Sequence, residues 1–135
     1  VSDLRADPLH WVTATSSPCT SIFHPARVEQ PVDQLATFGP DPTNHYDSAS
    51  RWWKHELLHR RVLRDHAASI ATFGVARDTI EREWIAEPPT TADAVATSAK
   101  AEEEWLAALV AADLPDARPA WLRDLWRALD EAGGL

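Results

Sequence analysis

The sequence has few cysteines, few glycines and no long apolar run. Its single cysteine, Cys19, cannot form an internal disulfide, which is typical of proteins from a reducing compartment. None of its four glycines belongs to a Gly-rich phosphate-binding loop. No apolar stretch approaches the ~18 residues that a transmembrane helix needs, and nothing at the start resembles a signal peptide. These absences predict a cytoplasmic protein that does not span a membrane.

Basic residues are outnumbered by acidic ones. The 135-residue chain holds 13 Lys and Arg against 21 Asp and Glu, for a formal net charge of −8. This balance argues against general affinity for nucleic acid or for an anionic membrane surface. What the chain does have is seven tryptophans, which we expect to act as large anchors on helix faces.

The first part of the chain, residues 1–28, predicts a pair of strands. β-type residues form two runs, at 10–15 and at 20–23, and Ser16, Ser17 and Pro18 between them are a turn signal. Two short strands cannot make a stable sheet alone. Together with a first residue that is Val1 rather than Met, this favours a piece of a larger domain.

The rest of the chain predicts helices. Residues 29–47 are proline-rich and read as an extended connection, and the region 48–135 carries helical patterns. We expect helices over 52–73, broken or bent at Gly74, then over 79–85, from a cap at Thr91 to about 112, and from Pro119 to the glycines at 133–134. The fold class is therefore α+β, with two short strands followed by three or four helices.

The stretch HELLH, residues 55–59, matches the H-E-x-x-H zinc motif of metallopeptidases. His55 and His59 lie one helical turn apart and could bind one metal ion, with Glu56 acting on its water. A catalytic zinc site needs a third protein ligand. His66 is seven residues beyond His59, about 10 Å along a helix axis, which is too far to share the metal.

A packing helix explains the same residues without a metal. The apolar face of this helix is expected to comprise Trp52, Trp53, Leu57, Leu63 and Ile70, with the histidines along its edge. Lys54, Arg60 and Arg61 also surround the motif with positive charge, which disfavours a dication. The packing interpretation is favoured, and no metal or cofactor is expected. Two alternatives stay open, a small zinc metallopeptidase using His55, Glu56 and His59, and a non-catalytic helical interaction module.

No other group of residues completes a catalytic site. Cys19 follows Pro18 in a β context, and we expect a buried structural thiol, on the strand face opposite His24. The run Glu102–Glu104 is expected to form a solvated helix face. Arg51, like the arginines at 60, 61 and 64, is expected to be exposed or paired with acidic residues.

Two stretches together resemble the secernin/C69 dipeptidase family. HWVTATSSPCTSIFHPARV (10–28) is similar to a family strand pair of the form HW-x-T-G-T…P-x-x-S-x-F-x-P, with Ala14 in place of the glycine. HYDSASRWWKHELLHRRVL (45–63) is similar to a later family helix, W-W-x-H-E-x-L-H-R. The residues that carry the match are Trp11, Trp52, Trp53, His55, Glu56 and His59.

This resemblance implies the C-terminal part of an N-terminal-nucleophile hydrolase with an αββα sandwich. Such enzymes cleave dipeptides or related amides with an N-terminal cysteine and need no metal, so HELLH would belong to a packing helix. Here the first residue is Val1, and Cys19 does not match the nucleophile, so no catalytic residue can be transferred. The resemblance thus implies a chain that is inactive alone and needs a missing N-terminal portion or a partner subunit.

Overall fold

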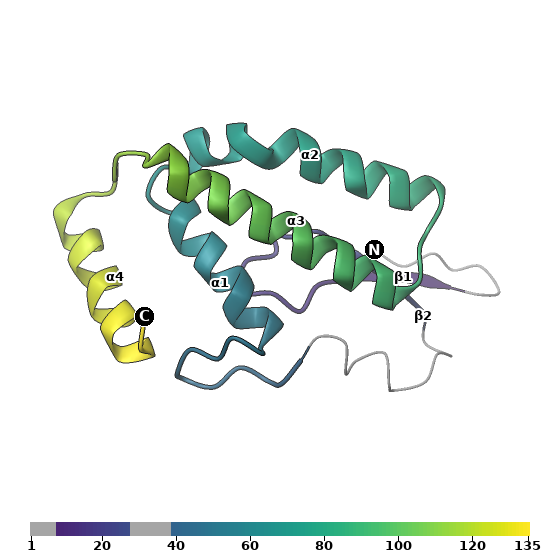
Figure 1. Cartoon of the computed structure of the whole chain (residues 1–135), viewed down its shortest axis with the longest axis horizontal. Helices are drawn as coiled ribbons and strands as arrows, with labels where there is room; N and C mark the ends of the chain where they lie inside the picture. Colours follow the sequence, from purple (N-terminus) through teal and green to yellow (C-terminus); the bar gives the residue numbers. More distant parts are fainter. Residues whose placement is uncertain (1–7, 28–38) are drawn as a thin grey trace.

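A computed structural model describes residues 8–27 and 39–135 and shows an α+β arrangement (Figure 1). Two antiparallel strands, β1 (Leu9–Val12) and β2 (His24–Arg27), precede four helices in the described part of the chain. This confirms the predicted fold class at the level of α+β, with two strands before the helices. Residues 29–38 of the predicted connection lie outside the described residues, and residues 39–50 contain neither helix nor strand.

The second strand does not lie where the sequence predicted it. β2 occupies residues 24–27, and its Pro25 is opposite Trp11 of β1. Residues 18–20 instead form a turn, in which the amide of Thr20 donates to Ser17 O at 3.1 Å, and residues 21–23 are not part of a strand. The hydroxyls of Thr13 and Ser21 contact one another at 2.9 Å. Short hydroxyl side chains compete in this way with strand ladders, which explains the error.

The first helical stretch is two helices. α1 spans Arg51–Val62 and α2 spans His66–Ala86, so the predicted helix over 52–73 is broken at 63–65. The break forms where the side chain of Asp65 accepts a hydrogen bond from Ala68 N at 3.1 Å and caps α2. Gly74 lies inside a continuous α2 and neither breaks nor ends it. Asp is a favoured N-cap residue, so the cap at Asp65, and not Gly74, sets the interruption of this helical stretch.

Replacing Asp65 with alanine should lower the free energy of unfolding by about 1 kcal/mol, because α2 loses the acceptor for one of its first amides. Urea denaturation measures this change. Ser48→Ala is the control, since Ser48 is an exposed residue shortly before α1 and is not the N-cap residue of that helix. Its effect should stay within about 0.5 kcal/mol. An equal loss in both variants would contradict the capping role of Asp65.

The last two helices are α3 (Thr91–Ala112) and α4 (Ala120–Gly133). Thr90, one residue before the predicted cap, caps α3 by accepting from Asp93 N at 3.1 Å. Pro119 immediately precedes α4, as expected for its role at a helix start. Figure 1 shows α2 and α3 side by side, the hairpin behind them, and α4 at one end beside α1.

The core lies where α1, α2 and α3 meet the turn of the hairpin. Phe73 of α2 stacks on Trp105 of α3 with ring centroids 4.8 Å apart. The buried apolar cluster comprises Ile22, Leu58, Val62, Phe73, Trp84, Ala94, Trp105 and Leu109. Among the described helices, none is long and apolar enough to cross a membrane.

Candidate functional site

A buried polar network joins the hairpin to α1 and α3. The hairpin contributes Thr20 and His24, α1 contributes Arg51 and His55, and α3 contributes Ser98 and Glu102. Every one of these side chains is at most 5% exposed. Polar groups at this depth are tolerated only when they satisfy one another. The network is therefore a second, polar core beside the apolar one.

Glu102 is the centre of this network. One guanidinium nitrogen of Arg51 lies 2.8 Å from Oε1 of Glu102, and another lies 2.8 Å from Oε2. Nδ1 of His55 lies 3.2 Å from the same Oε2. Burial acts to raise the pKa of Glu102, but the contacts with His55 and Arg51 outweigh it, so its pKa lies below the ordinary value. The carboxylate is thus held charged between two basic groups.

Ser98 connects this centre to the hairpin. Its hydroxyl oxygen accepts from Arg51 at 2.9 Å and forms a hydrogen bond of 2.7 Å with Nε2 of His24. Burial, followed by the nearby charge of Arg51, lowers the pKa of His24 from 6.5 to about 4. His24 is therefore neutral at physiological pH and adds no further charge to the buried network.

The hydroxyl of Thr20, the imidazole of His55 and the carboxylate of Glu102 lie next to one another in space, as the three groups of a hydrolase triad do. Their hydrogen bonds, however, do not fit catalysis. Nε2 of His55 lies 3.0 Å from the Thr20 hydroxyl and 3.2 Å from the carbonyl oxygen of Ser17. A carbonyl oxygen can only accept, so Nε2 carries a hydrogen and cannot take a proton from Thr20. The hydroxyl of Thr20 is 1% exposed and donates to the same carbonyl at 3.1 Å. The arrangement therefore joins the hairpin turn to α1 and α3.

The HELLH residues divide between two environments. His55 is fully buried in the network, and protein atoms engage both of its ring nitrogens. Glu56 instead binds Nδ1 of His59 at 3.0 Å and Nε of Arg60 at 2.9 Å. Burial acts to raise the pKa of Glu56, but these partners, led by His59, lower it overall. Each residue of the motif thus already has partners within the protein. Within residues 8–27 and 39–135, no three His, Cys, Asp or Glu side chains are grouped as a metal site would require.

The tryptophans of the two motifs have packing roles. Trp53 is buried, donates from its ring nitrogen to Thr43 O at 3.2 Å, and meets Trp52 edge-to-face at 5.0 Å between centroids. Trp11 packs against the core from β1. The predicted apolar face of the helix needs correction, because the buried face of α1 includes polar residues. Its members are Arg51, Trp53, His55, Glu56, Leu58 and Val62.

Cys19 is exposed, which corrects the prediction of a buried thiol. It lies in the turn before β2, so the argument from opposite faces of a strand does not apply. Its sulfur lies 3.3 Å from the hydroxyl of Ser17, and its carbonyl accepts from Arg77 at 2.9 Å. In the described part of the chain, these contacts do not include a histidine that would activate the thiol.

Sequence reasoning missed Arg51, Ser98 and Glu102 as members of the network. Glu102 was expected to be solvated with its two neighbours, but it is 4% exposed. Arg51 was expected to be exposed or paired with an acidic residue; it is 5% exposed and is paired with Glu102. A signal was available. Ser98, Glu102, Trp105 and Leu109 follow 3–4 spacing, so Glu102 lies on the buried face of α3.

Comparison of the chain with protein-family models, with curated proteins and with solved structures gave no match.

Proposed function

We propose that this chain is the C-terminal, non-catalytic region or subunit of a cytoplasmic, secernin-like cysteine amidohydrolase. In this role the hairpin joins the edge of a larger sheet in an αββα sandwich, and the helices pack outside that sheet. Amide hydrolysis of a dipeptide type would be carried out by an N-terminal cysteine in the missing portion or in a partner subunit. The proposal needs no metal and no cofactor in this chain.

The observation that supports this proposal best is the buried network. It connects the two stretches that resemble the family, because Thr20 and His24 come from the first and Arg51 and His55 come from the second. Segments from opposite sides of a proline-rich connection thus form one packed unit. If this packed unit belongs to the family, we expect its polar residues to be determined by their contacts within the buried network and not by a role in catalysis.

The hairpin offers an apolar surface suited to a larger partner. Val12 and Phe23 are both 37% exposed, and Ile85 beside them is 69% exposed. A cavity of about 410 Å³, lined by Trp11, Phe23, Glu81 and Ile85, lies between the hairpin and α2. Because two short strands are marginal alone, an additional sheet packed here would stabilise them.

We expect the purified chain to hydrolyse no dipeptide, because the network carries no available nucleophile. The test compares this chain with the product of its complete reading frame, both assayed for release of free amino acids from a panel of dipeptides. The longer product should be active, and replacement of its N-terminal cysteine by alanine should abolish that activity. Hydrolysis by the present chain alone, lost in Cys19→Ala, would overturn the proposal.

A helical interaction module is the second candidate, and one feature of α4 favours it. Trp121, Leu125 and Leu129 form a row at i, i+4 and i+8, with 67%, 49% and 43% of their surfaces exposed. Exposed apolar rows of this type mark contact surfaces. The same experiment separates the two candidates. If the complete reading frame encodes no early cysteine and its product hydrolyses no dipeptide, the interaction module remains as the function.

A further inference from the structure

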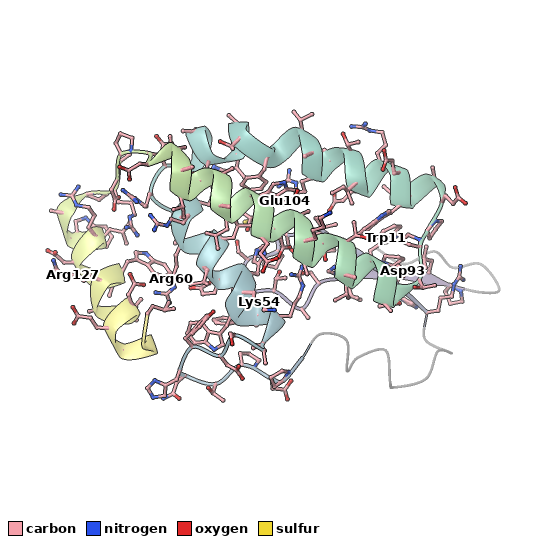
Figure 2. The ribbon with its side chains drawn as sticks, viewed as in Figure 1. Trp11, Lys54, Arg60, Asp93, Glu104 and Arg127 are labelled. Atoms are coloured by element: carbon pink, nitrogen blue, oxygen red, sulfur yellow. The ribbon has the colours of Figure 1, made fainter. Side chains whose placement is uncertain are left out.

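A cavity rich in arginine lies between α1, α4 and the connection from α3 to α4. Its volume is about 500 Å³, and its charged lining consists of Arg60, Arg61, Arg64, Arg118, Asp116 and Asp130. In Figure 2, Arg60 reaches from α1 toward α4 beside this region. Four of the chain's 13 basic residues thus gather in one place, although the net charge of the chain is −8.

Two of these arginines are already paired. Arg118 binds Asp116 through two hydrogen bonds of 2.9 and 2.7 Å, and these hold the pKa of Asp116 at about 2. Arg60 forms ion pairs with Glu56 and Asp130. The acidic side chains of the cavity therefore bind these two arginines directly, and the charge of Arg64 also helps to lower the pKa of Asp116.

Arg61 and Arg64 are the cations of the cavity whose guanidinium groups make no direct contact with its carboxylates. Both are half-buried, and neither forms an ion pair or a side-chain hydrogen bond within the described part of the chain. Their backbone is fixed, because Arg64 N donates to Arg61 O at 3.2 Å and Ala117 N donates to Arg64 O at 2.8 Å. The dipole of α1 favours cations at the C-terminal end of this helix. It forms no hydrogen bond with the guanidinium N–H groups, which therefore remain available as donors to a ligand.

The other side of the cavity is apolar and aromatic. Leu57, Leu106 and Val110 line it together with Trp126 of α4. The Trp126 ring is held by an edge-to-face contact with His59 at 6.0 Å and by the Arg60 guanidinium 5.1 Å from its centroid. A flat, oriented indole that lines the same cavity as two guanidinium groups without direct ion pairs suits a ligand with an apolar body and an anionic end.

We propose that this cavity binds a small organic oxyanion, an aromatic or apolar group that carries a carboxylate or a phosphate. Arg61 and Arg64 bind the oxyanion, and Trp126, Leu57 and Leu106 contact the apolar body. Guanidinium groups match both carboxylate and phosphate geometry with paired N–H donors. The site is separate from the hairpin surface, so it does not depend on the proposed amidohydrolase role.

The test uses two fluorescent probes that differ by one anionic group. Anilinonaphthalene sulfonate carries an aromatic body and a sulfonate, and N-phenylnaphthylamine has the same body without the charge. Titrations with the whole chain and with Arg61→Gln/Arg64→Gln give the two affinities. We expect the double variant to bind the sulfonate probe at least about tenfold more weakly, because each charge-assisted hydrogen bond contributes strongly, and to bind the neutral probe unchanged.

Controls separate this site from other apolar surfaces. Arg82→Gln removes an exposed arginine of α2 that lies away from the cavity, and it should leave both affinities unchanged. Each single variant, Arg61→Gln and Arg64→Gln, is also measured, so that a folding defect in the double variant does not decide the result. Circular dichroism confirms the fold in each case. Equal sulfonate-probe affinity in the wild-type chain and in the folded variants would overturn the proposal.

Competition then shows whether the cavity prefers a phosphate or a carboxylate. Phenyl phosphate and hippurate, an aromatic carboxylate, are each titrated against the bound sulfonate probe. Displacement by either compound in the wild-type chain, weakened in the arginine variants, supports the site and shows which oxyanion it prefers. Displacement by neither compound would overturn the proposal, because the cavity would then bind neither a carboxylate nor a phosphate that carries an aromatic group.

Discussion

Replacing Glu102 with glutamine is expected to lower the free energy of unfolding by about 3–5 kcal/mol, the usual cost of breaking a buried ion pair. The change keeps the side-chain shape and removes the charge that lies 2.8 Å from Arg51 and 3.2 Å from His55. Arg51 is 5% exposed, so its charge cannot be resolvated without opening the structure. Single domains are stable by about 5–15 kcal/mol, so this loss should be visible directly as a lower urea midpoint.

Glu104→Gln is the matched control for this prediction. Glu104 lies two residues further along α3, is 67% exposed, and approaches Lys100 only at 4.0 Å. Exposed pairs of this kind contribute little, so this variant should stay within about 0.5 kcal/mol of the wild-type chain. Similar losses in the two variants would show that Glu102 is not the centre of a buried network.

A double replacement tests the cause of the loss. Arg51→Met/Glu102→Leu removes both charges and fills the space with apolar groups, which is often neutral in comparable buried pairs. The double variant should therefore recover much of the stability lost by Glu102→Gln. If it is as unstable as the single variant, packing or the contacts of Ser98, rather than the unpaired Arg51 charge, would be the cause.

The helices were largely predictable because local signals determine them. Periodic apolar residues, the proline at 119 and the glycines at 133–134 correctly placed α3 and α4. The predicted break at Gly74 is wrong, because the division between α1 and α2 lies at residues 63–65, where Asp65 caps α2. Inside a packed helix, one glycine costs only about 1 kcal/mol, which tertiary contacts easily outweigh.

The network was less predictable because its residues come from three distant segments. His55 and Glu102 are 47 positions apart, as are Arg51 and Ser98, whose contact is 2.9 Å. No local pattern links such positions, and charged residues are almost never fully buried unless they are paired. Glu102 could have been recognised as buried from its place on the α3 face, but its partners could not have been identified from one sequence.

The pH dependence of stability should report His24. Its pKa is about 4 in the folded chain against an ordinary value of 6.5. At a pH between these two values, the unfolded chain therefore binds a proton at this residue that the folded chain does not bind. Stability therefore falls as the pH drops from 7.5 to 4.5, by about 2 kcal/mol from this residue. In His24→Gln, which keeps a polar atom for Ser98, that part of the fall should disappear when urea unfolding is measured across the range.

The position of the pH window separates His24 from the buried carboxylates. The pKa values of Glu56 and Glu102 lie below 4.5 in the folded chain, so their contributions to stability are present above that pH and are lost only in stronger acid. Packing lost against Trp84, whose ring centroid lies 6.1 Å from that of His24, would lower stability at every pH without changing the slope. His45→Gln, at an exposed position, controls for the loss of one imidazole. If His24→Gln and His45→Gln keep the same slope between pH 7.5 and 4.5, His24 is not the group that makes the folded chain acid-sensitive there.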